Sequence, residues 1–184
     1  MSEKERKAYF GNNFNSPPEV VERCNRIATE NVLKQGTSKK GRFIPKNPKK
    51  YMGDPTNIIY RSMWEKKVME SLDDNLSVLR WASEEIIIPY ISPIDNRRHR
   101  YFPDFYVEAL SADGTLKKVL IEVKPAAQSQ EPKKPERRTK RYINEVMTYG
   151  INQAKWKAAE EYCLDKGWDF MILTEKELFK KNSK

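Results

Sequence analysis

The stretch that decides the fold is RYFPDFYVEALSADGTLKKVLIEVK, residues 100–124. Apolar and polar residues alternate over residues 100–110 and again over residues 116–124, which predicts two β-strands. Asp113-Gly114 between them is a typical hairpin turn. Period-two alternation in the second strand places Val119, Ile121 and Val123 on one face and Leu120, Glu122 and Lys124 on the other. An apolar face and a charged face therefore share one short strand.

The flanking segments extend this hairpin into an α/β domain. Apolar residues recur at helical spacing over residues 56–73, after the capping sequence Asp54-Pro55-Thr56. Residues 84–91 favour a strand, and residues 92–96 a turn. A helix capped by Thr139 is expected over residues 140–163, followed by a strand over residues 169–173 and a short helical tail. Its apolar stripe comprises Ile143, Met147, Gly150, Ala154 and Ala158. This order predicts a mixed β-sheet flanked by helices.

Positive charge is concentrated in two segments of a chain whose net charge is +9. Residues 1–50 hold 12 Lys or Arg against five acidic residues, and residues 117–141 hold nine against three. We interpret residues 1–50 as a basic N-terminal arm, partly extended or helical, with a helix beginning at Pro18. Residues 51–184 form the folded domain. Basic segments of this kind suit a polyanion, although a solvated surface or a docking strap for a protein partner is the alternative.

Residues 125–138 contain three prolines and no core pattern, so they predict a basic loop beside the charged strand face. This loop and the arm supply the expected phosphate contacts: Lys39, Lys40, Arg42, Lys46, Lys133, Lys134, Arg137, Arg138, Lys140 and Arg141. Such contacts read no base edges, so little sequence specificity is expected. Binding should weaken steeply with salt.

Several protein classes are excluded or disfavoured. No stretch is apolar enough to span a membrane or to act as a secretory signal, so a soluble intracellular protein is expected. Cys24 and Cys163 match no metal or disulfide pattern and are interpreted as free thiols. His99 is the single histidine, which argues against His-metal nucleases and favours a surface or phosphate-contact role. No glycine-rich phosphate loop is present, so an NTPase is disfavoured. Trp64 and Trp156 are expected in the core.

The chemistry is carried by Asp104, Glu122 and Lys124. Phosphodiester hydrolysis requires a hard cation held by convergent oxygens, and the predicted hairpin can bring Asp104 beside Glu122. Same-face alternation adds Lys124, whose ammonium can orient water or stabilise the transition state. The alternative for a bare Glu-x-Lys is an exposed strand with a solvated ion pair. Its combination with Pro103-Asp104 and the basic loop favours a nuclease site.

This combination resembles the PD-(D/E)XK nuclease superfamily, whose signature matches Pro103-Asp104 and Glu122-Val123-Lys124. The resemblance implies a restriction-endonuclease-like fold and a Mg²⁺ site, with Mn²⁺ as the alternative cation, held by Asp104, Glu122, the Val123 carbonyl and Glu65. Glu65 resembles the acidic residue that members add from the preceding helix, and Glu84 or Glu85 could replace it. Gln153 resembles a supporting residue of the following helix, with Lys155 or Tyr149 nearby.

Longer segments resemble the head completion nucleases of T-even-like tailed bacteriophages. These are residues 43–48, 81–85, 99–104, 121–125 and 141–149. The resemblance implies action on double-stranded DNA of the packaged genome during head completion and head–tail joining, beside portal or neck proteins and without a membrane. The implied location is the host cytoplasm during assembly, or the virion. A catalytically silent DNA-binding adaptor of the neck is the alternative. The sequence does not distinguish endonuclease from exonuclease action.

Overall fold

The computed structural model describes residues 39–179, which fall within one compact unit. Predictions for residues 1–38, including the helix from Pro18 and the state of Cys24, lie outside the described residues. No helix in the described part is long and apolar enough to cross a membrane.

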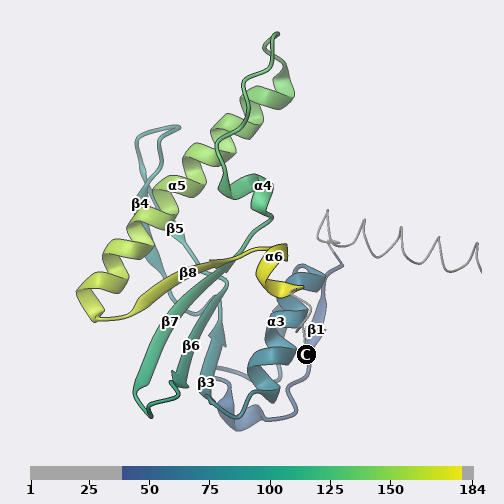
Figure 1. The fold of residues 1–184 in the computed structure, drawn as a ribbon, viewed down its shortest axis with the longest axis vertical. Coiled ribbons are helices and arrows are strands. Elements are labelled where there is room, and N and C mark those ends of the chain that lie inside the picture. Colours follow the sequence, from purple (N-terminus) through teal and green to yellow (C-terminus); the bar gives the residue numbers. More distant parts are fainter. Residues whose placement is uncertain (1–38, 180–184) are drawn as a thin grey trace, which may run out of the picture. The chain divides into compact units, whose positions relative to one another are not determined.

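A four-stranded mixed sheet forms the centre of the fold, in the order β3-β6-β7-β8 (Figure 1). Its strands are β3 (Val78–Ser83), β6 (Phe105–Leu110), β7 (Leu116–Val123) and β8 (Asp169–Leu173). The first three pair antiparallel, whereas β8 pairs parallel with β7. Gly114 in the β6–β7 turn has φ +81°, a left-handed conformation that glycine adopts without steric cost. The predicted hairpin and mixed sheet are confirmed.

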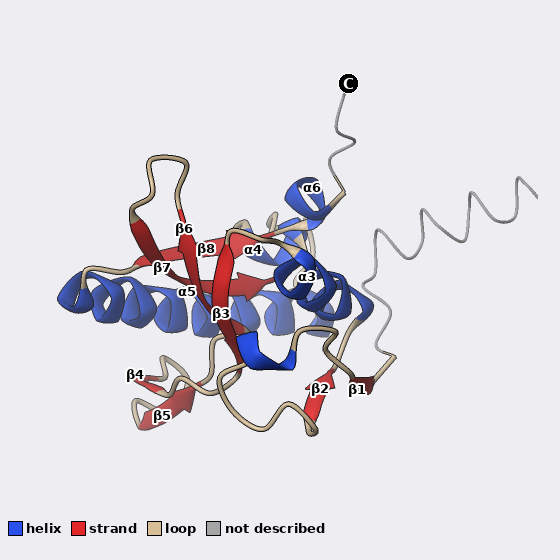
Figure 2. Cartoon of the chain, turned by 90° about the horizontal axis from the view of Figure 1, so that it is seen from below, coloured by secondary structure: helices blue, strands red, loops and turns tan. Residues whose placement is uncertain are grey.

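Two helices cover the sheet from opposite sides (Figure 2). Helix α3 (Met63–Asp74) contributes to a core that also holds side chains of β3, β6 and β7: Trp64, Val68, Met69, Leu72, Val78, Trp81, Phe105, Val107, Ile121 and Val123. Helix α5 (Lys140–Lys166) packs on the other face around Ala82, Tyr101, Tyr106, Leu120, Trp156, Ala159 and Cys163. Both faces of the C-terminal half of β7 are therefore covered, which is why Glu122 is buried there.

Smaller elements complete the fold. Strands β1 (Gly41–Phe43) and β2 (Ile58–Tyr60) form one antiparallel ribbon, and β4 (Ile88–Ile91) and β5 (Arg98–Tyr101) form another. The short helices are η2 (Pro48–Lys50), α4 (Ala126–Ser129) and α6 (Glu175–Leu178). The predicted turn over residues 92–96 is present, because Ser92 N–H donates to the Arg97 carbonyl and Asn96 N–H to that of Ser92.

The first core helix is shorter than the sequence indicates. Helix α3 begins at Met63 and not at residue 56, because Ser62 is its N-cap and accepts a hydrogen bond from Glu65 N–H at 3.1 Å. Residues 58–60 pair with β1 instead. Asp54 binds Thr56 within a local turn, so the predicted capping sequence does not cap the helix.

The segment predicted as one strand over residues 100–110 is two strands in different sheets. Strand β5 ends at Tyr101 and β6 begins at Phe105. Pro103 between them is fully buried and has no N–H for a ladder, which accounts for the break. The predicted strand over residues 84–91 is also shortened, since only residues 88–91 form β4.

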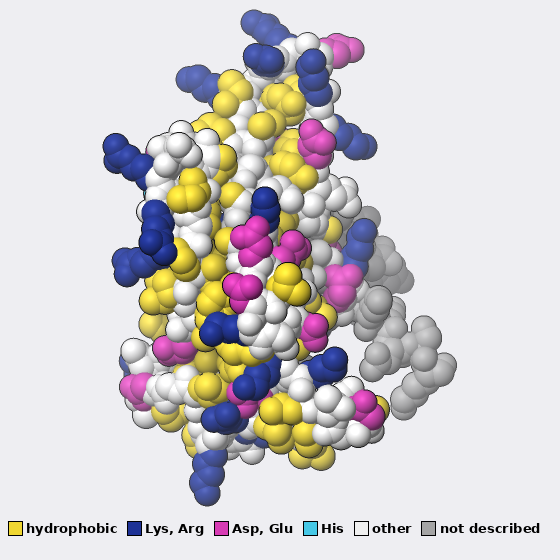
Figure 3. Space-filling view, turned by 90° about the vertical axis from the view of Figure 1, so that its left-hand side faces the viewer, with side chains coloured by type: hydrophobic (Ala, Val, Ile, Leu, Met, Phe, Trp, Pro, Cys, Tyr) yellow, Lys and Arg dark blue, Asp and Glu magenta, His cyan; other side chains and the backbone are white. Residues whose placement is uncertain are grey.

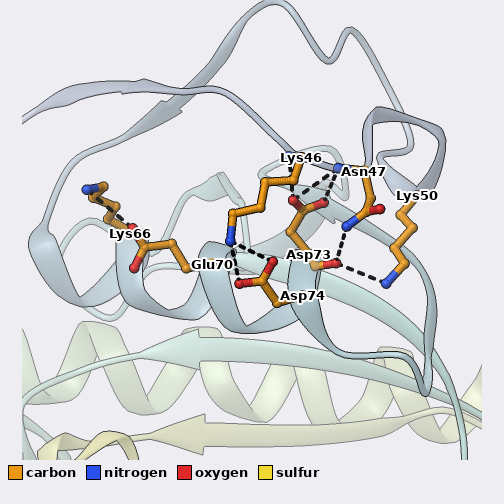
Figure 4. Close-up of polar contacts among 7 residues, drawn as sticks. All are labelled: Lys46, Asn47, Lys50, Lys66, Glu70, Asp73 and Asp74. Atoms are coloured by element: carbon orange, nitrogen blue, oxygen red, sulfur yellow. Dashed lines mark hydrogen bonds and ion pairs between the residues drawn. The ribbon is translucent and has the colours of Figure 1, made fainter.

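Part of the predicted arm belongs to the folded domain. Phe43 is buried in the α3-side core, and Lys46 and Asn47 donate their backbone N–H groups to the Asp73 carboxylate (Figure 4). Residues 41–50 are thus fastened to α3, so the domain begins before the predicted boundary at residue 51.

Helix α5 extends well beyond the sheet at its N-terminal end (Figure 1). Thr139 caps it as predicted, accepting from Tyr142 N–H, and Gly167 ends it in the left-handed conformation. The apolar stripe is correct only in part. Ala154 and Ala158 pack against the core, whereas Ile143 and Met147 are 47% and 41% exposed.

Candidate active site

The hairpin brings the two predicted carboxylates together. Phe105 pairs with Ile121, so the register continued by one residue places Asp104 opposite Glu122. Val123 N–H donates to Asp104 Oδ2 at 2.7 Å. Among residues 39–179, no hydrogen bond is formed with the other oxygen of Asp104. Asp104 is thus fixed by the backbone of β7 with one oxygen open.

Lys124 completes the cluster. It follows β7 on the same face as Glu122, and its Nζ lies 3.0 Å from Glu122 Oε1. All three side chains line one cavity of about 400 Å³, together with Arg61, Glu84, Arg100, Tyr101, Phe102 and Lys155. Three acids, four cations and an aromatic hydroxyl therefore line a single small space. This composition suits an anionic, phosphate-containing substrate.

The charged groups of the cavity shift one another's pKa values. Burial and the neighbouring Glu122 charge raise the pKa of Asp104 to about 8, against the lowering effects of Lys124 and the Val123 N–H. Burial lowers the pKa of Lys124, but Glu122 and Asp104 outweigh it and the net pKa is raised. Lys124 consequently stays an ammonium, while the two carboxylates repel each other. A further positive charge beside Asp104 would relieve that repulsion.

Tyr101 is a site residue that the sequence did not single out. Its hydroxyl donates to Glu122 Oε2 at 2.8 Å, and both residues are only 3% exposed. Burial and Glu122 raise the pKa of Tyr101 far above its ordinary value, so the hydroxyl keeps its proton. The sequence interpretation places Tyr101 and Asp104 on one strand over residues 100–110. In the structure Tyr101 ends β5, a strand separate from β6, and its hydroxyl reaches Glu122 of β7.

The third predicted carboxylate lies beside the cavity and not in its lining. Glu65 accepts from Ser62 Oγ at 2.9 Å and from Arg61 N–H at 2.7 Å, so its carboxylate is held at the start of α3. Its charge still raises the pKa of both Asp104 and Lys124.

Of the two alternatives, Glu84 lines the cavity and Glu85 does not. Glu84 forms an ion pair with Arg61 and has φ +57°, an unusual backbone conformation for a residue with a side chain.

Helix α5 presents a different residue to the cavity from the one expected. Gln153 is exposed and is not among the lining residues, whereas Lys155 is. Lys155 Nζ lies 5.7 Å from the Tyr101 ring centroid, within cation–π range. Arg61 and Arg100 also line the cavity. Arg100 ends the basic run Arg97-Arg98-His99-Arg100, a signal that the sequence carried, whereas Arg61 stands outside any basic run. His99 is at the surface, paired with Asp95 at 2.9 Å.

The predicted phosphate contacts lie away from the cavity. Six of them, from Lys133 to Arg141, are exposed on the loop before α5 and on its first turn, where Lys and Arg side chains gather at the top of Figure 3. Lys39, Lys40 and Arg42 are also exposed. Lys46 is engaged by Asp74, with Nζ to Oδ2 at 2.8 Å. None of the ten lines the cavity around Asp104.

The donor set around Asp104 fits a hard cation. Among residues 39–179 no three His, Cys, Asp or Glu side chains form a complete metal cage. Mg²⁺ does not need one, since it is usually held by one or two carboxylates and retains several waters. The open Asp104 oxygen and the adjacent Glu122 meet that requirement.

Comparison with known proteins agrees with this geometry. The family model described as TnsA-like endonuclease N terminal matches residues 75–175, a span that contains Asp104, Glu122 and Lys124. The chain belongs to the TnsA-like endonuclease family. The head completion nuclease of Enterobacteria phage T4 is 41% identical over 139 residues, which cover 73% of this chain and 90% of that protein.

Membership of the TnsA-like endonuclease family makes the chain a nucleic-acid hydrolase with a restriction-endonuclease-like fold. The mixed sheet with a helix on each side is that fold, and the predicted superfamily is confirmed. The family match begins after α3, so Glu65 lies outside it whereas Gln153 lies within it.

Proposed function

We propose that this chain is a divalent-cation-dependent DNA nuclease that acts in phage head completion. The observation that carries the proposal is the joining of Asp104, Glu122 and Lys124 in one cavity, with an open Asp104 oxygen and a raised Asp104 pKa. A scaffold has no need of two carboxylates, one half-buried and one buried, that repel each other. A nuclease does, because their repulsion favours binding of a cation.

Asp104 and Glu122 would hold the cation, with the Val123 carbonyl as a third ligand and Glu65 supporting from the end of α3. Mg²⁺ is the expected ion, and Mn²⁺ is the alternative. When bound, the cation activates water and offsets charge on the phosphorane and the leaving oxygen. Glu84 is the competing third carboxylate, since it lines the cavity and Glu65 does not.

Lys124 would orient the attacking water and stabilise negative charge on the phosphate as it develops. Its ion pair with Glu122 holds Nζ inside the cavity before substrate arrives. Arg61, Arg100 and Lys155 line the same space and would contact phosphate oxygens of the bound strand. Gln153 lies on α5, where the supporting residue was expected, but it does not line the cavity.

The exposed cations at the start of α5 would hold the DNA backbone farther from the cut. They contact phosphates and not base edges, so binding should depend steeply on salt and little on sequence. The six predicted contact residues from Lys133 to Arg141 belong to this surface, and Lys39, Lys40, Arg42 and Lys46 would add contacts from the segment around β1.

The biological role rests on the name of the relative, a head completion nuclease. We infer the same process for this chain, with double-stranded DNA of the packaged genome as the substrate and head–tail joining as the step served. Portal or neck proteins would be the partners. Action would take place in the host cytoplasm during assembly, or in the virion.

The test is cleavage of linear and supercoiled DNA with Mg²⁺ or with EDTA. The variants are Asp104→Ala, Lys124→Ala and the control Asp113→Ala, which changes an exposed aspartate in the turn of the same hairpin. We expect cation-dependent cutting by the wild type and the control, and loss of turnover in the first two. Nicking of supercoiled DNA would identify endonuclease action.

Absence of cutting in every protein, with salt-sensitive DNA binding intact, would overturn the proposal and favour the silent adaptor. Full cutting by Lys124→Ala would remove Lys124 from the mechanism while leaving the nuclease in place.

A further inference from the structure

Each carboxylate oxygen of Glu122 is bound by a side chain from a different part of the fold. Tyr101 donates its hydroxyl to Oε2 at 2.8 Å, and Lys124 lies 3.0 Å from Oε1. Tyr101 is at the end of β5, in a different sheet from Glu122. The hydrogen bond therefore ties the β4–β5 ribbon to the central strand at the active-site carboxylate.

The two carboxylates of the site are fixed by different means. Asp104 receives the backbone N–H of Val123, a donor that belongs to the strand itself. Glu122 has a longer side chain, and within residues 39–179 its carboxylate is held by the side chains of Tyr101 and Lys124. Because it is only 3% exposed, little water can replace a lost donor. Its orientation should depend on the Tyr101 hydroxyl.

The Tyr101 ring is itself well placed to act as a rigid donor. It is buried in the α5-side core, and Tyr101 pairs with Ile88 across the β4–β5 ribbon. Lys155 of α5 lies 5.7 Å from the ring centroid. A tyrosine has few rotatable bonds, so a packed ring presents its hydroxyl at a defined place with little loss of side-chain entropy.

We propose that Tyr101 is a positioning residue that sets the cation affinity of the site by holding Glu122 in its ligating orientation. The inference rests on the proposed function, since it concerns the same site. Tyr101 of β5 thereby takes the supporting role that the family resemblance suggested for Gln153, which is exposed on α5. A carboxylate already oriented before the cation arrives loses less freedom on binding.

The chain offers a matched control in a second buried tyrosine–glutamate pair. Tyr106 donates its hydroxyl to Glu108 Oε1 at 2.7 Å, and both residues are 4% exposed. Glu108 is paired with Arg80 and Lys118, and it does not line the cavity. Tyr106→Phe therefore removes the same kind of hydrogen bond from a buried glutamate of the same sheet as Glu122 and leaves the site untouched.

The experiment compares full-length wild type, Tyr101→Phe and Tyr106→Phe. Mn²⁺ and Mg²⁺ binding to the cation-free proteins is measured by calorimetry, and DNA cutting is measured across a cation titration. Loss of an outer hydrogen bond to a metal ligand typically weakens metal binding about 10–100-fold, and that range is expected for Tyr101→Phe. Its cutting rate should recover largely at saturating cation. Tyr106→Phe should bind cation as the wild type does.

Three results would overturn the inference. The first is unchanged cation binding in Tyr101→Phe. The second is an equal loss in both variants, which would mark a general effect of removing a buried hydroxyl. The third is a wild-type chain that neither binds the cation nor cuts DNA, which would reject the proposed function together with the role of Tyr101. A wild type that cuts while Tyr101→Phe binds normally would reject the role of Tyr101 alone.

Discussion

Asp73 at the end of α3 and Asp104 before β6 are both protected aspartates, but their oxygens are used differently. Asp73 is 1% exposed and receives the N–H groups of Lys46 at 2.6 Å and Asn47 at 3.2 Å (Figure 4). Asp104 receives one N–H and lies opposite another carboxylate. The backbone satisfies Asp73, which fastens residues 46–47 to the helix. Asp104 is left with an open oxygen and a raised pKa, so burial of an aspartate has opposite meanings at the two places.

The largest expected difference between the two aspartates is in DNA cutting. Asp104→Asn should reduce the cutting rate by more than about 100-fold, since even outer partners of metal ligands are worth about 10–100-fold. Asp73→Asn should cut at the wild-type rate when corrected for the folded fraction. Single-turnover cleavage at saturating Mg²⁺ measures both. Equal losses in the two variants would mean that Asp104 acts only through folding.

For stability, unlike DNA cutting, substitution of Asp73 should have the larger effect of the two aspartates. Asp73→Ala removes the acceptor of two backbone N–H groups, and a hydrogen bond to a charged group contributes about 1.5–3 kcal/mol. The free energy of unfolding should therefore fall by about 2–4 kcal/mol. Urea denaturation of the cation-free proteins tests this, with Asp104→Asn as the comparison. Asp104→Asn should be more stable than the wild type, because it removes a repelled charge.

The stability gain of Asp104→Asn should depend on pH. The folded-state pKa of Asp104 is about 8, above its ordinary value of 3.8, so the folded protein binds a proton that the unfolded chain has already lost. Wild-type stability should therefore decrease as the pH rises from about 4 to about 8, and the decrease should then level off. Thermal melts in EDTA at pH 5 and pH 9 measure the gap between variant and wild type. A constant gap would contradict the raised pKa.

The smallest effect is expected at the surface beside Asp73. Lys46→Ala removes the exposed ion pair with Asp74 but keeps the Lys46 backbone N–H that Asp73 uses. Exposed pairs contribute little, so the melting temperature should hardly change. A loss as large as that of Asp73→Ala would mean that the side chain of Lys46, and not its backbone, fastens this segment.

Local patterns predicted the parts of the fold that depend on local chemistry. The β6–β7 hairpin, the Thr139 cap of α5 and strand β8 follow from alternation, turn residues and capping, and all are present. The register of that hairpin is also what places Asp104 opposite Glu122. The core of the candidate site could therefore be predicted from about 20 consecutive residues.

What the sequence could not predict depends on contacts between distant segments. Arg61 and Lys155 reach the cavity from a turn before α3 and from the middle of α5, and no spacing pattern joins them. Residues 41–50 resemble a basic arm in composition, but Phe43 is buried and Asp73 binds the backbone that follows it. Composition reports charge, whereas the position of such a segment is decided by partners elsewhere in the chain.

The backbone at Glu84 is strained, and this strain lowers the stability of the folded protein. Its φ of +57° lies in the left-handed region, which glycine adopts readily. A residue with a side chain is strained there, at a cost of about 1 kcal/mol or more. A glycine there would relax the backbone at the end of β3 and leave the cavity with one carboxylate fewer. The protein therefore keeps a backbone strain that a glycine would remove, and with it a third carboxylate, paired with Arg61, in the wall of the cavity.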